Sequence, residues 1–154
     1  MTDSSAHPVA DGSALGGAHA AEARTRAFLA ALERKDVAEL ERSLHPQATL
    51  TIALSLTGAP EAAGHFAGKA EVLGYLRGIT EGMDRIAFTD VRVSATAAGD
   101  TTFVQTTGAF TTADGRPYNN VYVMRLDWRE GLLAHVDEYG NPVTYTSVFG
   151  EPAA

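Results

Sequence analysis

Residues 117–139 read PYNNVYVMRLDWREGLLAHVDEY. Two runs rich in aliphatic, aromatic and β-branched residues flank the turn Arg129-Glu130-Gly131, a pattern typical of a β-hairpin. Similar turn sequences at 98–100 and 113–115 divide the second half of the chain into further strands. The expected strands are residues 86–97, 101–112, 117–127 and 132–139. Because connections this short join antiparallel neighbours, we expect an antiparallel meander.

The first half of the chain favours helices. Residues 18–34 are strong helix formers with an apolar stripe, and residues 36–39 have the spacing of a capping box that opens a short second helix, stopped by Pro46. A strand is expected at 48–56, a loop or short hairpin at 57–68, and a third helix over 69–79 that ends within 78–82. Helices followed by a hairpin-linked sheet predict an α+β fold.

Length and composition are those of one globular domain. The chain has 154 residues, 45% of them hydrophobic and 20% charged. We expect a disordered N-terminal arm over 1–17, which is small, polar and glycine-punctuated, and a single domain over 18–150.

Charge and residue content exclude several classes of function. The 19 acidic against 12 basic residues argue against nucleic-acid and anionic-membrane partners. The absence of cysteine rules out disulfides, thiolate zinc sites and cysteine nucleophiles. The sequence contains no apolar run of membrane-spanning length and no secretory signal features at its start, so a soluble, cytoplasmic protein is expected.

Alternation along a strand divides its side chains between two faces. In 117–127 one face carries Asn120, Tyr122, Met124 and Leu126, and the other Asn119, Val121, Val123, Arg125 and Asp127. Both faces are partly apolar, which predicts a central strand covered on both sides. In 132–139 the same reasoning groups Leu132, Ala134, Val136 and Glu138 against Leu133, His135, Asp137 and Tyr139.

Glu138 is the lone carboxylate on an otherwise apolar face. Desolvation there would raise its pKa towards the range useful for proton transfer near neutrality. The alternative is that Glu138 lies at the strand end, where the face already meets water.

The segment 115–150 resembles the nuclear transport factor two-like superfamily, which includes ketosteroid isomerase, limonene epoxide hydrolase and SnoaL-like polyketide cyclases. The matching features are Tyr118-Asn119-Asn120 at a strand start, Glu130-Gly131 in the next turn, and Glu138-Tyr139-x-Asn141-Pro142 at the end. The resemblance extends over about residues 18–150. It implies a curved antiparallel sheet wrapped around a helical layer, forming a cone with an apolar pocket.

The resemblance also implies roles for particular positions. The acidic residue before the aromatic in the last strand is catalytic in several branches, and here it is Glu138. The Arg and Asp of the epoxide hydrolases are matched by Gln105 and Thr107, a departure from that triad. The functional histidine of the phenazine A/B proteins is matched by the segment 83–85, Met-Asp-Arg, a second departure.

Further candidates surround the expected pocket. His65, beside Phe66 at the pocket rim, would shuttle protons, or it is a solvated loop histidine. Tyr122 and Asn120 would stabilise an oxyanion, or they are buried polar groups with satisfied hydrogen bonds. Gln105 and Thr107 would orient a substrate carbonyl, or they form an ordinary polar strand face. The expected apolar contacts to substrate come from Phe66, Phe110 and Met124. His135 and Asp137 share a face but lack a third ligand, so we expect no metal site.

Taken together, these residues predict a cofactor-free enzyme. It would cyclise, isomerise or dehydrate an apolar, carbonyl-bearing, polyketide-like metabolite, with Glu138 as general acid or base. The alternative is a ligand-binding or dimerisation module of the same fold, in which Tyr122, Met124 and Phe110 fill the pocket. In either case the apolar outer residues Val121 and Val123, with the resemblance, indicate a homodimer formed through the convex side of the sheet.

Overall fold

The computed structural model describes residues 12–152, with side chains from residue 16 onward. The helices are α1 (Gly12–Glu33), α2 (Val37–Ser43), α3 (Lys69–Gly82) and α4 (Pro142–Phe149). The long strands are β1 (Leu44–Ile52), β4 (Phe88–Ala95), β5 (Thr101–Gly108), β8 (Val121–Arg129) and β9 (Leu132–Gly140). The short strands are β2 (Gly64–Ala67), β3 (Met83–Arg85), β6 (Phe110–Thr112) and β7 (Pro117–Tyr118). The α+β class expected from the sequence is confirmed.

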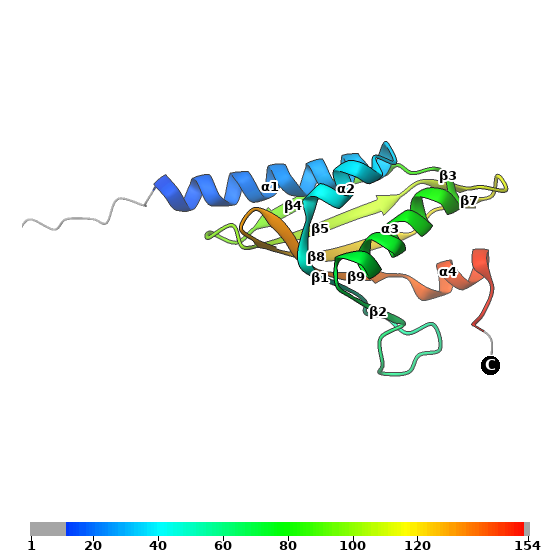
Figure 1. Ribbon diagram of the computed structural model, residues 1–154. Helices are drawn as coiled ribbons and strands as arrows, with labels where there is room; N and C mark the ends of the chain where they lie inside the picture. Colours follow the sequence, from blue (N-terminus) through cyan, green and yellow to red (C-terminus); the bar gives the residue numbers. More distant parts are fainter. Residues whose placement is uncertain (1–11, 153–154) are drawn as a thin grey trace, which may run out of the picture.

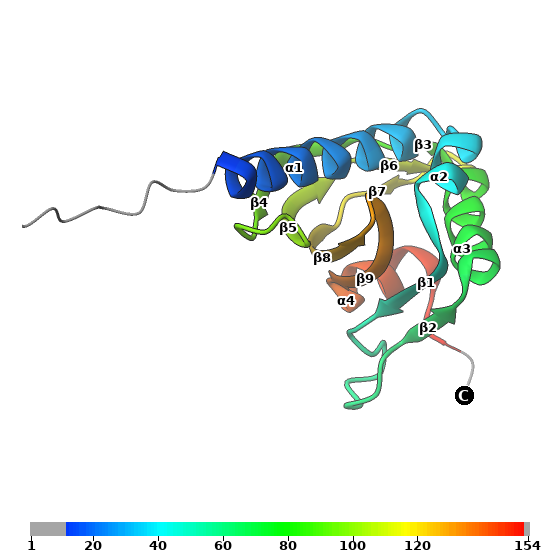
Figure 2. The same ribbon diagram turned by 60° about the vertical axis from the view of Figure 1, so that its left-hand side comes forward.

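The main sheet has the strand order β2-β1-β9-β8-β5-β4 and curves around the helices (Figures 1 and 2). Strands β4, β5, β8 and β9 form the antiparallel meander that the turn sequences predict. One pairing differs from the expected antiparallel sheet, because β1 runs parallel to β9. The expected strands 101–112 and 117–127 are each broken into two. The pieces β6 and β7 pair with each other, and β6 also pairs with β3, to form a small second sheet.

Helix α1 lies across the concave face of the sheet (Figure 2). Its start approaches the β4–β5 turn so closely that a Cβ on Gly17 would lie 2.8 Å from the carbonyl oxygen of Ala98. Farther along, the hydroxyl of Thr25 is 2.8 Å from that of Thr102, which also accepts a hydrogen bond from the indole of Trp128 at 3.1 Å. Residues 12–17, expected within the disordered arm, are therefore helical. The rest of that expected arm, residues 1–11, lies outside the described part of the chain.

The second and third helices lead into the sheet. The carboxylate of Asp36 accepts a hydrogen bond from the backbone N–H of Glu39, which is the cap predicted for α2. Helix α2 ends at Ser43, and β1 begins at once with the buried Leu44. The expected strand 48–56 thus starts four residues early, and Pro46 lies inside it. Helix α3 buries Val72, Leu73 and Leu76 against β1, as its sequence pattern predicts.

The faces of β8 and β9 determine which side chains meet the helices. On β8 the inner residues Asn120, Tyr122, Met124 and Leu126 are buried as predicted, with Asn120 directly before the strand. The outer face is not covered within this chain, since Val121 is 58% exposed and Val123 46%. The expectation that protein covers both faces is therefore wrong for the single chain. Exposed valines are compatible with the expected dimer, which stays a prediction.

A bulge changes the predicted faces of β9. Trp128 pairs with Leu133 and Asp127 with His135, so Ala134 is an extra residue in the ladder. Leu133 consequently lies on the inner face and is buried, although simple alternation predicts it on the outer face. Beyond the bulge the alternation holds, and Val136 and Glu138 point inward while His135 and Asp137 point outward.

Candidate active site

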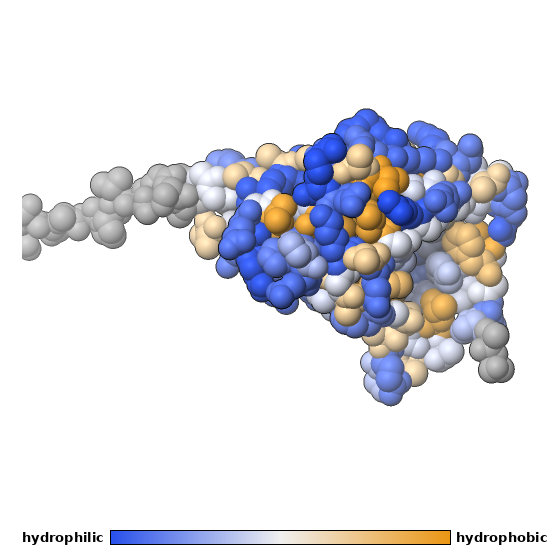
Figure 3. Space-filling view, in the orientation of Figure 1, coloured by the Kyte–Doolittle hydropathy of each residue, from blue (hydrophilic) through white to orange (hydrophobic). Residues whose placement is uncertain are grey.

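A cavity of about 390 Å³ lies between the inner face of the sheet, helices α3 and α4, and the loop before β2. Its walls are mainly apolar, and Phe110 and Met124, the predicted substrate contacts, are among them. Apolar surface borders a hollow beside α4 in the space-filling view (Figure 3). The cavity is open, so Tyr122, Met124 and Phe110 line it rather than fill it. The sequence analysis expected a cone-shaped fold with an apolar pocket, and this cavity has the position and the lining of such a pocket.

Glu138 reaches the cavity from β9, where it pairs with Met124 of β8. Some of its surface remains accessible because the carboxylate lines the cavity, but protein atoms surround it closely. This burial raises the pKa of Glu138, and a hydrogen bond from Tyr75 partly offsets the rise by favouring the charged form. The strand-end alternative, a carboxylate in bulk water, does not describe this environment.

Tyr75 holds one oxygen of that carboxylate. Its hydroxyl donates to Oε2 of Glu138 at 3.1 Å, and no side chain or backbone group in residues 12–152 bonds to Oε1. The ring of Tyr75 stacks on Phe66 of β2 with centroids 4.7 Å apart. Burial, with the nearby carboxylate, raises the pKa of Tyr75 well above its usual value, so the hydroxyl keeps its proton. Sequence reasoning missed Tyr75, although it lies on the apolar stripe of α3 between Val72 and Ile79.

Tyr122 lies flat on the inner face because two glycines flank it. A Cβ on Gly108 would be 2.9 Å from its ring, and a Cβ on Gly140 would be 3.2 Å away on the other side. Burial raises the pKa of Tyr122 above its usual range, with the neighbouring Tyr118 and Glu138 adding to the effect. The hydroxyl therefore keeps its proton at the cavity wall, where it interacts with the hydroxyl of Tyr118.

Asn120 differs from its predicted role as an oxyanion donor. Its Nδ2 donates to the hydroxyl of Tyr118 at 3.0 Å and to the carbonyl of Asn141 at 3.1 Å. Its Oδ1 accepts the backbone N–H groups of Val121 and Asn141. Both protons of the amide are used, so Asn120 ties β8 to the start of α4. Tyr118 is the donor that sequence reasoning missed, because its oxygen accepts from Asn120 and its own proton stays available.

Comparison with known proteins decides the family. The model of the SnoaL-like domain matches residues 25–136, which is most of the chain. The chain belongs to the SnoaL-like domain family. The match ends two residues before Glu138, so the evidence for this residue comes from the cavity itself.

Solved structures share the fold of this SnoaL-like domain. A candidate isomerase from Bacillus subtilis superposes with a TM-score of 0.73 at 22% identity, over 86% of this chain and 94% of its own. A candidate polyketide cyclase from Xanthomonas campestris pv. campestris gives 0.70 at 17%, over 85% and 97%. An epoxide hydrolase from M. tuberculosis, similar to limonene epoxide hydrolase, gives 0.63 at 16%, over 87% and 90%. No curated protein sequence matches the chain. No helix of the described residues is long and apolar enough to cross a membrane.

Four predicted site residues of the SnoaL-like domain lie outside the cavity lining. His65 is exposed on the outer side of β2, where its Nδ1 is 2.8 Å from the hydroxyl of Thr51, so it is not placed to exchange protons with a ligand in the cavity. Gln105 and Thr107 point outward from β5, towards Val123 and Val121 of β8. The register differs by one residue from the predicted one, and the side chain that faces inward is Thr106. Phe66 faces inward but acts through its stack on Tyr75.

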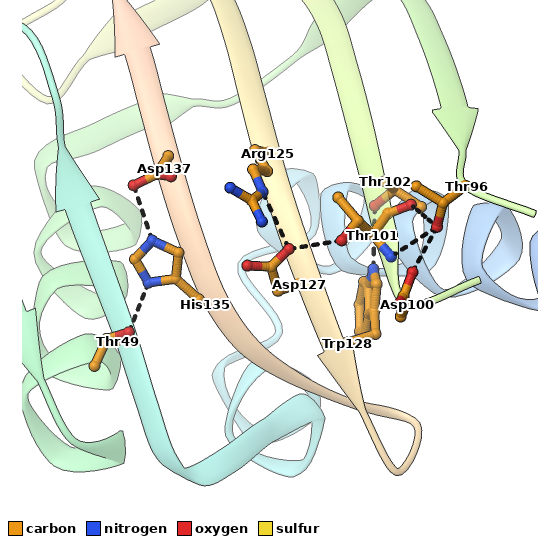
Figure 4. Close-up of polar contacts among 10 residues, drawn as sticks. All are labelled: Thr49, Thr96, Asp100, Thr101, Thr102, Arg125, Asp127, Trp128, His135 and Asp137. Atoms are coloured by element: carbon orange, nitrogen blue, oxygen red, sulfur yellow. Dashed lines mark hydrogen bonds and ion pairs between the residues drawn. The ribbon is translucent and has the colours of Figure 1, made fainter. Parts of the chain in front are cut away.

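The outer face carries its own polar network (Figure 4). His135 lies between the hydroxyl of Thr49 at 2.6 Å and the carboxylate of Asp137 at 2.8 Å. On the next strand Asp127 accepts from Arg125 at 3.2 Å and from Thr101 at 2.8 Å. Within residues 12–152 no three His, Asp or Glu side chains lie close enough together to hold a metal ion.

Proposed function

We propose that this SnoaL-like domain is an enzyme that moves a proton on a neutral, apolar, carbonyl-bearing substrate. The observation that carries the proposal is Glu138, a carboxylate desolvated in an apolar cavity, with one oxygen held by Tyr75 and the other without a partner among residues 12–152. A raised pKa brings a carboxyl group closer to the pH at which it exchanges protons efficiently. Every group that the reaction needs belongs to the chain itself.

The chemistry follows from which atoms are available. Oε1 of Glu138 removes a proton from the carbon beside the substrate carbonyl, and the C–H electron pair moves to form the enolate. The hydroxyls of Tyr122 and Tyr118 donate hydrogen bonds to the oxygen on which the negative charge develops. Both hydroxyls keep their protons, because burial raises the pKa of each of these two tyrosine hydroxyls.

The fate of the enolate sets the overall reaction. Where the substrate has a β,γ double bond, the enolate is a conjugated dienolate, and return of the proton from Glu138 to its γ-carbon completes an isomerisation. Attack of the enolate carbon on a second carbonyl of the same molecule forms a ring, and the alkoxide takes the proton. Expulsion of a β-hydroxyl group, protonated by Glu138, is a dehydration. The apolar walls, Phe110 and Met124 among them, exclude water and strengthen these interactions.

The solved structures that share the fold support some of these reactions more than others. The isomerase and cyclase candidates share the fold at low identity, which supports a fold able to house such a cavity. Epoxide hydrolysis by an Arg and Asp pair is not favoured, since no inward position of β5 is charged; these positions are Thr102, Val104, Thr106 and Gly108. The alternative is a cavity that binds a ligand without chemistry.

A proton-exchange experiment tests the proposal without knowledge of the natural substrate. The probe is 2-tetralone, a neutral bicyclic ketone with acidic protons beside its carbonyl, followed by NMR as deuterium from D₂O replaces those protons. We expect the protein to accelerate exchange and Glu138→Gln to lower that rate by about 10²–10⁴-fold. Asp137→Asn, which removes the same charge from the adjacent residue on the outer face, is the control and should retain the rate.

Two outcomes would contradict the proposal. Full exchange by the Glu138→Gln protein would show that this carboxylate is not the base. Binding of the ketone with no acceleration by the unmodified protein would favour a ligand-binding module instead.

A further inference from the structure

Among the described residues, the cavity lining contains one carboxyl group and no basic side chain to balance its charge when it is ionised. Among the described residues that line it, Glu138 is the only acid, and none is Lys, Arg or His. The remaining polar lining groups are tyrosine hydroxyls and the side chains and backbone of two asparagines. Asn120 donates both of its amide protons to other protein groups, the hydroxyl of Tyr118 and the carbonyl of Asn141. The cavity therefore offers a ligand hydrogen bonds from neutral hydroxyls but no ion pair.

One basic residue, Arg116, bonds to helix α4 from outside the cavity lining. Arg116 donates to the backbone carbonyl of Val148 at the end of α4 and pairs with Asp114 at 2.9 Å. Both charged groups of that pair are exposed on the outside of the molecule. The positive charge of Arg116 is thus compensated before it can serve a ligand inside the cavity.

An anionic ligand in this cavity meets two costs. It loses its hydration in apolar surroundings, and no cation compensates for that loss. It also faces the carboxylate of Glu138, and repulsion between like charges is strong where water is excluded. A neutral ligand with a carbonyl or hydroxyl oxygen avoids both costs and gains hydrogen bonds from Tyr118 or Tyr122.

We propose that the cavity selects uncharged ligands and that Glu138 is the group that excludes carboxylates and phosphates from its interior. The inference rests on the proposed function for the assignment of this cavity as the substrate site. It limits the part of the substrate that enters the cavity to neutral ketones, esters, lactones or phenols. Any anionic group that the substrate carries must remain outside the mouth.

Two probes with the same ring system test the selection. Binding of 2-acetylnaphthalene, a neutral ketone, is compared with binding of 2-naphthoate, which is ionised at pH 7, by NMR titration of the full-length protein. We expect the ketone to bind at least about tenfold more tightly than the carboxylate, because a like charge in a desolvated site disfavours the anion. In Glu138→Gln this ratio should fall by about tenfold, chiefly through tighter binding of naphthoate. Asp137→Asn removes an equal charge from the outer face and should leave the ratio unchanged.

Three results would overturn the inference. They are equal affinity of the unmodified protein for both probes, an unchanged ratio in Glu138→Gln, and failure of the neutral ketone to shift resonances of cavity residues at its solubility limit. The inference and the proposed function also fail separately, because Glu138→Gln is expected to lose proton exchange while gaining affinity for the anion. A variant that gains naphthoate affinity but keeps full exchange would support selection and contradict catalysis by Glu138.

Discussion

Asp137 and Glu138 are neighbours in β9, but the two faces of the sheet give them different surroundings. Asp137 points outward, where His135 bonds to it and solvent reaches both side chains (Figure 4). Glu138 points inward to an apolar cavity, where Tyr75 is the one hydrogen-bond partner of its carboxylate within the described chain. Two carboxylates one residue apart thus differ in chemistry because a strand alternates its side chains between faces.

The two faces of the sheet also differ in how closely their side chains pack. Around the ring of Tyr122 the inner face leaves no room for a Cβ on Gly108 or Gly140 without a shift of its neighbours. The outer face leaves Val121, Val123 and Phe103 exposed and has room for larger side chains. Substitutions that are tolerated on one face are therefore expected to be costly on the other.

The largest effect on stability is expected where the inner face is tightest. A Cβ at Gly108 would lie 2.9 Å from the ring of Tyr122 and 3.0 Å from that of Phe110. Gly108→Ala should lower the free energy of unfolding by about 1–3 kcal/mol, because both rings are held by the cavity wall. Gly74→Ala, at a position on α3 with open space around it, is the control and should stabilise by about 0.5–1 kcal/mol. Urea unfolding measures both, and equal effects would contradict the tight inner face.

A smaller effect should depend on pH and separate the two carboxylates. Because burial raises the pKa of Glu138, the folded protein keeps this proton at pH values where the unfolded chain, with a pKa of ~4.3, has lost it. The folded state then binds more protons, so this group lowers stability as pH rises from the unfolded pKa to the folded one. Glu138→Gln removes the penalty, by about 1.4 kcal/mol for each unit of the shift.

The measurement is urea unfolding of both proteins from acidic to mildly alkaline pH. The stability of Glu138→Gln relative to the unmodified protein should rise with pH and then level off above the folded pKa. Asp137→Asn, which removes a carboxylate from the outer face of the same strand, is measured alongside as the control for the loss of a negative charge. A flat difference for Glu138→Gln would mean that this carboxylate is not desolvated.

The smallest effect concerns the bond that holds Glu138. The hydroxyl of Tyr75 donates to the charged carboxylate and favours the charged form, so Tyr75→Phe should raise the pKa of Glu138 further. The Phe66 stack keeps the substituted ring in place. Tyr118→Phe removes a hydroxyl that bonds to Asn120 instead and should leave the pKa of Glu138 unchanged. An unchanged pKa in Tyr75→Phe would remove the positioning role from this residue.

Local patterns in the sequence predict much of this arrangement. The three turns after residue 97 give the meander, the helical spacing of Val72, Leu73 and Leu76 gives α3, and alternation gives the inner face of β8. Glu138 stands out because it is the one carboxylate in an apolar set. Each of these inferences needs only residues that are neighbours along the chain.

The predictions that were wrong depend on how one strand pairs with another. The parallel pairing of β1 with β9 joins segments far apart in the sequence, so no turn sequence predicts it. The placement of Gln105 and Thr107 depends on a register that a shift of one residue reverses. The bulge at Ala134 moves Leu133 to the other face in the same way.

Two polar side chains of the site show a related limit. Tyr75 meets Glu138 across 63 residues of sequence, and Asn120 bonds to Asn141 across 21. Whether a polar side chain is free for a ligand depends on such partners, which only the folded structure reveals. This is why sequence reasoning assigned oxyanion binding to Asn120 rather than to Tyr118.

The pKa of Glu138 tests the central claim most directly. A carbon-detected NMR titration of its carboxyl group, assigned by comparison with Glu138→Gln, measures it in the intact protein. We expect the titration midpoint of Glu138 to lie clearly above the ~4.3 of an ordinary glutamate, because burial in the apolar cavity disfavours the charged carboxylate. A midpoint at or below that value would show a solvated carboxylate and would contradict both the proposed proton transfer and the exclusion of anions.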